Sequence, residues 1–197
     1  MKSLAIEREF GSGGREVGTK VAKLAGIPYY DEELLMKAAQ DQGLSVEAFK
    51  YYDEKRTGSF LYDLAAYSNY AYGNKSNSVY ELFDGIEKTI QKLELEGPGV
   101  FIGRCSTEIL KNRKNVLRVF IYSSDAEKRK KRLMKMEGFS EAEVEKTMEK
   151  TDKQRSNYFH FWTQKDWKDE ANYDMKLNTG TLSIDDCARI LYDAIQT

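Results

Sequence analysis

Short apolar runs of strand length recur along the chain, and longer segments of mixed polarity separate them. Runs of this length are typical of buried strands when helical segments stand between them. The predicted strands are residues 4–6, 27–30, 100–102, 116–122 and 175–177.

The longer segments repeat their apolar residues with the period of an α-helix, most clearly at 17–25, 86–93 and 184–195. Serines that precede an acidic residue by three positions predict helix starts at Ser124, Ser140 and Ser183. Strands that alternate with helices indicate an α/β fold, with a parallel sheet covered on both faces by right-handed crossovers. No Pro/Ser-rich linker interrupts the pattern, so we expect one domain over residues 1–197.

The composition argues for a local anion site and against a global one. The 31 Lys and Arg nearly balance the 32 Asp and Glu, so neither nucleic acid nor an anionic membrane is an expected partner. Cys105 and Cys187 lack the spacing of a zinc site and are expected to be reduced packing residues. No apolar stretch reaches about 18 residues, which favours a cytoplasmic protein. A homo-oligomer is compatible with the sequence.

The strongest candidate for chemistry is a glycine-rich turn between the first strand and the first helix. Glycines let backbone N–H groups converge on an anion, and the helix start adds unpaired donors and a positive dipole end. An arginine at the helix start would reach the phosphates of a bound nucleotide with its planar fork. A turn without a ligand is the alternative. The residues assigned to nucleotide binding are Gly11, Ser12, Gly13, Gly14, Arg15 and Glu16.

The turn departs from the Walker A form G-x-x-x-x-G-K-[ST] at three positions. With Gly14 as the second glycine, Glu9 takes the place of the first glycine, Arg15 of the lysine and Glu16 of the Ser/Thr. The hydroxyl that usually meets Mg²⁺ is therefore absent. Glu16 is a candidate Mg²⁺ ligand, and the alternative is an acidic residue that the helix dipole stabilises.

Residues 8–18, followed by 26–31, resemble the cytidylate kinase-like family. The similarity continues at 103–104, 151–158, 172–174 and 178–179, so it covers nearly the whole chain. The resemblance implies a three-layer fold of the P-loop NTPase type, in which a parallel five-stranded sheet has helices on both faces and a helical lid. It also implies an acceptor-binding helical region at about 31–96, a lid at about 129–165, and nucleotide substrates.

The resemblance assigns the acceptor side of the site to residues beside two strands. Arg104 follows the strand 100–102, at an end where open α/β sheets bind ligands, and it would hold the acceptor phosphate. A surface ion pair is the alternative. Asp31 would help to hold the acceptor or Mg²⁺, or it would simply cap the next helix. Lys37 is a further candidate for the acceptor phosphate, and Asp152 is assigned to substrate binding.

Arginines in the lid region are expected to close over the transferred phosphoryl group. Charge develops on the phosphoryl oxygens during transfer, and positioned arginines supply large rate factors. We assign this catalytic role to Arg132 and Arg155, together with Arg15, and we regard Arg129 as a further counterpart of lid arginines. The alternative is a solvated, charge-rich helix. His160 is expected to pack or to anchor the lid.

These features predict Mg²⁺-dependent transfer of the ATP γ-phosphoryl group to a nucleoside monophosphate, with CMP or dCMP first because of the resemblance. Two alternatives remain open. One is a catalytically silent nucleotide-binding regulatory protein, because the loop lacks the usual lysine and hydroxyl. The other is a kinase of a non-nucleotide small molecule, because residues 51–80 carry no feature that points to cytosine.

Overall fold

The computed structural model describes residues 1–31 and 79–197, and within helix α5 it describes side chains from residue 83 onward. Five strands form one sheet in the order β2-β3-β1-β4-β5, and every neighbouring pair is parallel. The strands are β1 (Ser3–Arg8), β2 (Tyr29–Tyr30), β3 (Val100–Ile102), β4 (Val116–Tyr122) and β5 (Met175–Asn178). This confirms the predicted five-stranded parallel sheet.

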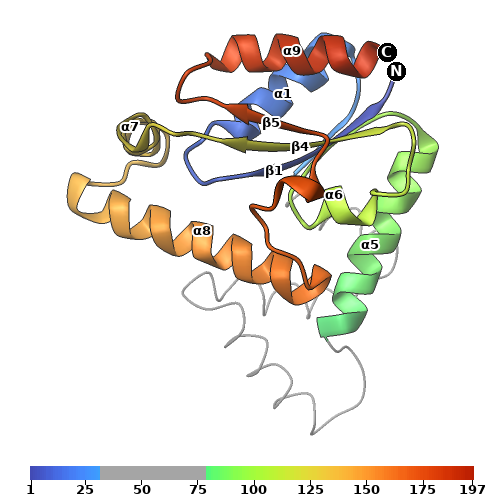
Figure 1. Cartoon of the computed structure of the whole chain (residues 1–197), viewed down its shortest axis with the longest axis horizontal. Helices are drawn as coiled ribbons and strands as arrows, with labels where there is room; N and C mark the ends of the chain where they lie inside the picture. Colours follow the sequence, from blue (N-terminus) through green and yellow to red (C-terminus); the bar gives the residue numbers. More distant parts are fainter. Residues whose placement is uncertain (32–78) are drawn as a thin grey trace, which may run out of the picture.

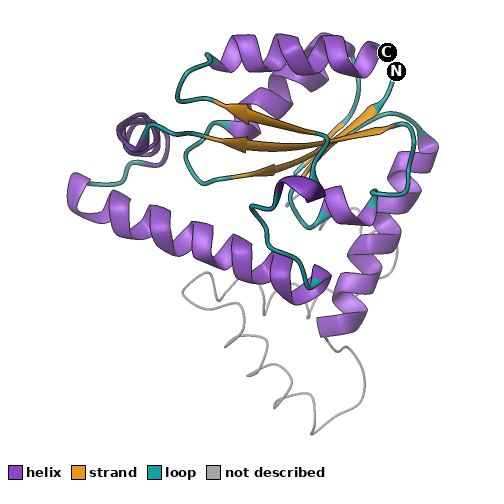
Figure 2. Ribbon diagram, in the orientation of Figure 1, coloured by secondary structure: helices purple, strands orange, loops and turns teal. Residues whose placement is uncertain are grey.

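Helices cover both faces of the sheet, as Figures 1 and 2 show. On one face lie α1 (Gly14–Ala25) and α9 (Ile184–Gln196). On the other lie α5 (Val79–Glu96), the short α6 (Ser106–Ile109) and α8 (Glu141–Thr163). The helix α7 (Ala126–Glu137) follows β4 and leads into α8, and a 3₁₀ turn at Glu170–Asn172 precedes β5. The parallel crossovers require this three-layer arrangement.

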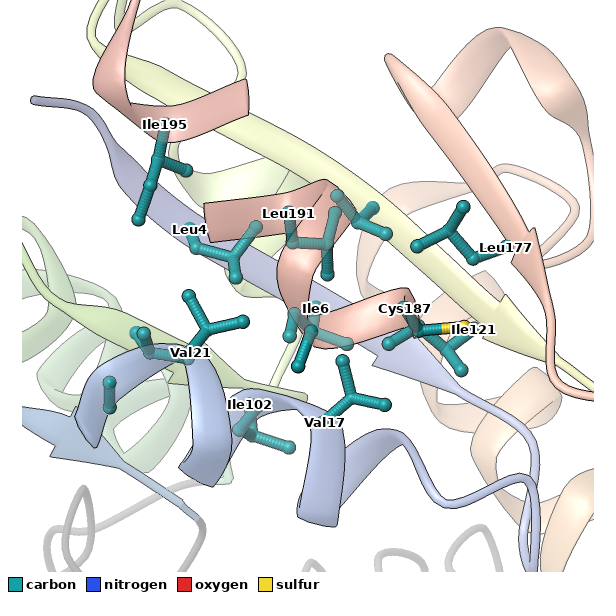
Figure 3. Close-up of a cluster of buried hydrophobic side chains, with 14 residues drawn as sticks. Leu4, Ile6, Val17, Val21, Ile102, Ile121, Leu177, Cys187, Leu191 and Ile195 are labelled. Carbon is teal, nitrogen blue, oxygen red and sulfur yellow. The ribbon is translucent and has the colours of Figure 1, made fainter. Parts of the chain in front are cut away.

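The alternation of side chains along β1 divides the core between the two faces. Leu4 and Ile6 point to the α1 and α9 face, where they pack with Val17, Val21 and Leu191 in the largest hydrophobic cluster (Figure 3). Ala5 and its neighbour Phe101 pack with α5 on the opposite face. By the same alternation Glu7 points to the α5 and α8 face and Arg8 to the α1 face. The alternation of apolar residues at the start of β1 therefore fixes the face of the sheet to which each charged residue at its end points.

The predicted lid region forms two helices that pack on each other. Leu133 of α7 is buried against Val144 and Met148 of α8, and Phe10 of the glycine-rich turn joins this cluster. The far half of α8 packs Phe159 against Phe120 of the sheet. Both ends of α8 are thus tied to the sheet or its loops.

Two of the predicted helix starts are confirmed, and one is wrong by a residue. Ser140 forms a capping box with Glu143, and the Ser183 hydroxyl accepts the N–H of Asp186. At α7 the cap is Asp125, whose carboxylate accepts the N–H of Lys128, rather than the predicted Ser124. The amide of Ser124 instead donates to Asn178 Oδ1, which ties the end of β4 to β5.

The strand predicted at 27–30 is shorter than expected. Only Tyr29 and Tyr30 pair with β3. The amide of Ile27 donates to Ala22 O at the end of α1, and Pro28 contributes only its carbonyl, which accepts the N–H of Val100. The first half of the apolar run, residues 27–28, therefore follows the end of α1 and does not extend the paired strand.

Candidate phosphate-binding site

The glycine-rich turn joins β1 to α1 at the carboxyl end of the central strand. Gly11 and Gly13 have φ values of 75° and 82°, in the left-handed region that favours glycine. Gly13 precedes the first residue of α1, and no side-chain hydrogen bond of the usual N-cap type is formed there. The start of α1 therefore keeps backbone donors and a positive dipole end for an anion.

Ser12 stabilises the inside of this turn and is fully buried. Its hydroxyl donates to Glu9 O at 2.8 Å and accepts the N–H of Gly14 at 3.3 Å. Its carbonyl accepts the hydroxyl of Thr179 at 2.7 Å, which ties the turn to the end of β5. Ser12 therefore holds the shape of the turn, and its hydroxyl is already used within it.

A buried cluster of charges supports the same turn from the lid side. Arg129 of α7 donates to Glu9 Oε2 at 3.3 Å, to Phe10 O at 2.6 and 2.8 Å, and to Asp152 Oδ2. Asp152 Oδ1 accepts the N–H of Phe10 at 2.7 Å, and Lys168 reaches Glu9 Oε1 at 2.6 Å. Side-chain exposure is 9% for Arg129 and 8% for Glu9. We call Glu9, Arg129 and Asp152 the buried cluster, and it fixes the backbone at Phe10.

The two lid arginines assigned to catalysis both reach the turn. Arg132 Nη1 donates to Gly11 O at 2.7 Å, and Arg155 Nη1 donates to Arg8 O at 2.9 Å. The guanidinium of Arg155 also lies 5.4 Å from the ring centre of Phe10. The fold therefore brings Arg132 and Arg155 to the glycine-rich turn and the strand end before it, from more than a hundred residues away. Their catalytic role stays a prediction.

Arg15 and Asp31 meet each other at the opposite edge of the turn. Arg15 Nη2 lies 2.7 Å from Asp31 Oδ2, and the Arg15 side chain is 61% exposed. Partial burial lowers the pKa of Arg15, but the charge of Asp31 acts against it and the net pKa is raised. Two residues that were assigned to separate substrates are thus paired in this structure.

Arg104 lies in an unusual turn after β3. Gly103, Arg104 and Cys105 have φ values of 71°, 55° and 56°, so three consecutive residues are left-handed. Residues held in this region cluster at ligand sites because the surrounding structure must enforce them. The guanidinium of Arg104 lies 5.6 Å from the ring centre of Tyr158 on α8. Since β3 and β1 are neighbours, this turn stands beside the glycine-rich turn, whereas Lys37 lies outside the described residues.

Glu16 stands in the first turn of α1 and is half-buried. Within residues 1–31 and 79–197, no group of three or more His, Cys, Asp or Glu is arranged to hold a metal ion. Mg²⁺ in phosphate-transfer sites usually keeps waters and substrate phosphates with one or two carboxylates, so one acid near the turn fits that chemistry. Glu16 is the carboxylate that the first turn of α1 offers.

Glu7 is a buried carboxylate that the sequence did not single out. Its Oε2 accepts the indole N–H of Trp167 at 3.2 Å, and within the described residues its Oε1 has no hydrogen-bond partner. Burial raises the pKa of Glu7, and the nearby charge of Arg8 offsets part of that rise. Burial also raises the pKa of the neighbouring Cys105 thiol well above its usual value. Both cysteines are buried and unpaired, as predicted.

His160 takes no part in the site. It is exposed near the end of α8, where Nδ1 lies 3.2 Å from the carbonyl of Lys165. This contact links the end of α8 to the loop that follows it. The expected role of His160 in packing or lid anchoring stays a prediction.

Sequence reasoning missed Glu9 and Arg8 as parts of the site's framework. It expected Arg129 to act with the lid arginines on the phosphoryl group, whereas in the structure Arg129 hydrogen-bonds within the buried cluster. A signal for Glu9 existed, because a carboxylate in the place of a Walker A glycine needs a charged partner if it is buried. Arg129 and Phe10 are 119 positions apart, which is too far for local patterns to connect them. Arg8 belonged to the family motif but received no role.

The parallel sheet, the glycine-rich turn before α1 and the arginine-bearing helices beside it define a P-loop kinase fold. The family model described as "Cytidylate kinase-like family" matches residues 3–181, and the chain belongs to this family. The family and the fold support a phosphotransferase.

Solved structures share this fold. An uncharacterized protein from Eubacterium ventriosum is 28% identical, with a TM-score of 0.76, and the match covers 100% of this chain and 99% of that chain. A shikimate kinase from Acinetobacter baumannii is 13% identical, with a TM-score of 0.54 and coverage of 100% and 93%. A gluconokinase from Sinorhizobium meliloti is 14% identical, with a TM-score of 0.54 and coverage of 99% and 91%. These two kinases share the fold.

No curated protein matches the sequence. In the part of the chain that the structure describes, no helix is both long enough and apolar enough to cross a membrane.

Proposed function

We propose that this protein transfers the γ-phosphoryl group of ATP to a nucleoside monophosphate, with CMP or dCMP as the first acceptors to test. The observation that carries the proposal is the convergence of cations on one edge of the sheet. Arg132 hydrogen-bonds to the glycine-rich turn, and Arg155 hydrogen-bonds to Arg8 at the end of β1. Arg104 stands in the adjacent turn after β3. Family membership supports the nucleotide as substrate.

In this proposal the start of α1 holds the donor phosphates. Backbone N–H groups of the first turn of α1 donate to phosphate oxygens, and Arg15 adds a cation at the rim. The buried cluster keeps the turn in shape before ATP arrives, so less ordering is needed on binding. Mg²⁺ would neutralise charge on the phosphates, and Glu16 is the residue that would hold it directly or through water.

Arg104 would hold the acceptor monophosphate, and Arg132 with Arg155 would stabilise the transferring group. The bond from the γ-phosphorus to the bridging oxygen of ADP breaks, and its electron pair leaves with ADP. A bond forms to an oxygen of the acceptor phosphate. That oxygen is already ionised at neutral pH, since the second pKa of a phosphate monoester is about 6. No general base is needed, which agrees with the place of His160 outside the site.

A coupled assay of ADP release over the common nucleoside monophosphates tests the proposal directly. We expect turnover with at least one of them and strongest turnover with CMP or dCMP. Shikimate and gluconate belong in the same panel, because kinases of those molecules share the fold. Turnover with a sugar or shikimate alone would replace the acceptor, and no turnover with any acceptor would contradict the enzymatic proposal.

A second function has a specific observation in its favour. Arg15, which replaces the Walker A lysine, is paired with Asp31, and the Ser12 hydroxyl is used inside the turn. A nucleotide-binding regulatory protein without catalysis would tolerate both features. It predicts that MgATP raises the melting temperature while no ADP is released with any acceptor.

A further inference from the structure

Arg8 runs across the candidate site from one phosphate-binding turn to the other. It is the last residue of β1, directly before the glycine-rich turn. A Cβ atom at Gly14 would lie 2.6 Å from Arg8 Cβ and 3.1 Å from its Cγ. A Cβ atom at Gly103 would lie 2.1 Å from Arg8 Nη1. The stem of Arg8 therefore rests on the start of α1, and its guanidinium rests on the backbone of the turn that carries Arg104.

The glycine at position 14 is explained by this contact. Gly14 is the first residue of α1, and unlike Gly11 and Gly13 it does not have a positive φ. Alanine would suit a helical backbone better than glycine by about 1 kcal/mol. What forbids a side chain is space, because the nearest atom to the added Cβ is Arg8 Cβ. The absence of a side chain at Gly14 therefore leaves room for Arg8 to pass beside the start of α1.

The guanidinium of Arg8 differs from its neighbours in its partners. Arg15 is paired with Asp31, Arg129 belongs to the buried cluster, and Arg132 donates to a loop carbonyl. For Arg8, in contrast, no carboxylate or carbonyl within residues 1–31 and 79–197 accepts a hydrogen bond from the guanidinium. The Arg8 side chain is partly buried, and its charge acts on the neighbouring Glu7, whose pKa it lowers against the effect of burial. A partly buried cation of this kind is suited to an anion that arrives from outside.

We propose that Arg8 binds the phosphate groups between the donor and acceptor ends of the site and supplies the charge that the missing Walker A lysine supplies in other P-loops. This inference rests on the proposed function, since it takes a phosphate-bearing ligand at the start of α1. The planar fork of Arg8 offers two parallel donors to phosphoryl oxygens. Its place beside both Gly14 and Gly103 lets one side chain contact a group that moves from one end to the other.

The test compares Arg8→Gln and Arg8→Met with Arg189→Gln, a matched control on the exposed surface of α9. Arg8→Met keeps an unbranched stem against Gly14 and removes only the charge and the donors. Binding of inorganic tripolyphosphate is measured by calorimetry, because this probe has no base or sugar and does not depend on the acceptor. We expect both Arg8 variants to bind it at least tenfold more weakly, and the control to match the wild type.

Steady-state kinetics provide the second readout. We expect kcat to fall by about 10²-fold or more in both Arg8 variants, since the charge acts on the transferring group. Arg8→Lys should recover part of kcat, because it restores the charge without the fork. A purely structural role would lower the melting temperature in all three variants without this pattern of rescue.

The outcomes distinguish a failure of the role of Arg8 from a failure of the proposed function. If the wild type catalyses transfer and the Arg8 variants bind tripolyphosphate as well as the wild type, the role of Arg8 is wrong and the kinase function stands. If the wild type binds neither ATP nor tripolyphosphate, both proposals fail. If Arg8→Gln and Arg8→Met both lose cooperative unfolding, Arg8 is a structural residue and its binding role is rejected.

Discussion

On the lid side of the glycine-rich turn, Arg129 is 9% exposed and joins Glu9 and Asp152 in the buried cluster that holds the backbone at Phe10. On the other side Asp31 is shielded to a similar degree, with 14% of its side chain exposed, but its partner Arg15 is 61% exposed. Both sides hold opposite charges at short distances, yet their energetics differ. Removing one partner of a buried pair leaves an uncompensated charge, which is strongly destabilising. A pair whose cation is open to water, as Arg15 is, is screened and contributes less.

The contrast separates two uses of arginine in one site. Cations of the buried cluster are already committed to the protein and shape the turn. Arg15 on the open side is 61% exposed, so water can replace a contact that it loses. A sequence motif alone does not distinguish these two uses of arginine. The burial of each arginine and the partners of its guanidinium do distinguish them.

The largest expected effect comes from Arg129→Ala. This change removes the cation that Glu9 and Asp152 share, although Lys168 still contacts Glu9. It also removes two bonds to Phe10 O, so we expect a loss of about 3–5 kcal/mol in the free energy of unfolding. Urea denaturation measures it. Lys131→Ala on the exposed side of α7 is the control, with an expected change within about 0.5 kcal/mol. Equal effects of the two variants would contradict the buried cluster.

Asp152→Asn is expected to have the next largest effect. The amide can still accept the N–H of Phe10, but it no longer carries a charge for Arg129, so we expect a loss of about 2 kcal/mol. Denaturant unfolding is again the measurement, with Glu149→Gln, exposed on the same helix, as the control. An unchanged stability together with a large rise in the KM for the acceptor would instead support the substrate-binding role assigned from the sequence.

Glu7→Gln sharpens the comparison through pH. Burial raises the pKa of Glu7 in the folded state above its unfolded value, so its contribution to stability is greatest at low pH and is lost as pH rises. We expect wild-type stability to fall relative to Glu7→Gln as the pH rises above the usual carboxyl range, from pH 5 to pH 8. Unfolding of both proteins at the two pH values tests this. A difference that does not change with pH would contradict the raised pKa.

Arg15→Gln is expected to have the smallest effect on stability, below about 1 kcal/mol, because the side chain of Arg15 is 61% exposed. For ATP we expect a loss of affinity of less than tenfold, since the guanidinium must share its donors with Asp31. Calorimetric titration with MgATP measures the loss. A larger loss than that of Arg8→Gln would reverse the roles given to the two arginines.

Much of the fold follows from local patterns. The apolar run at 116–122 becomes β4 with the predicted bounds, and Ser140 and Ser183 begin helices because a hydroxyl followed by an acid at the third position satisfies free N–H groups. The helix start predicted at Ser124 is wrong because the next residue, Asp125, is an equally good N-cap. Choosing between them depends on Asn178, which lies 54 positions away.

The site was predictable only in part, and the reason is distance along the chain. The glycine-rich turn is local, so its residues could be named from the sequence. The partners of Glu9 are set by the packing of α7 and α8 against the turn, and no periodicity shows which arginine becomes buried. Arg132 and Arg155 were identified through the family resemblance, and their contacts with the turn are a result of the tertiary fold.

The left-handed turn after β3 sets stability against function at three residues, Gly103, Arg104 and Cys105. Each non-glycine residue in this region costs roughly 1–2 kcal/mol, which glycine at the same position would not. A laboratory selection for heat resistance alone would therefore favour Arg104→Gly. The selected protein would be more stable, but it would lack the guanidinium that faces the acceptor in the proposed reaction. Trade-offs of this kind between stability and activity are common. Engineering for thermal tolerance should keep this turn fixed and seek its gains elsewhere.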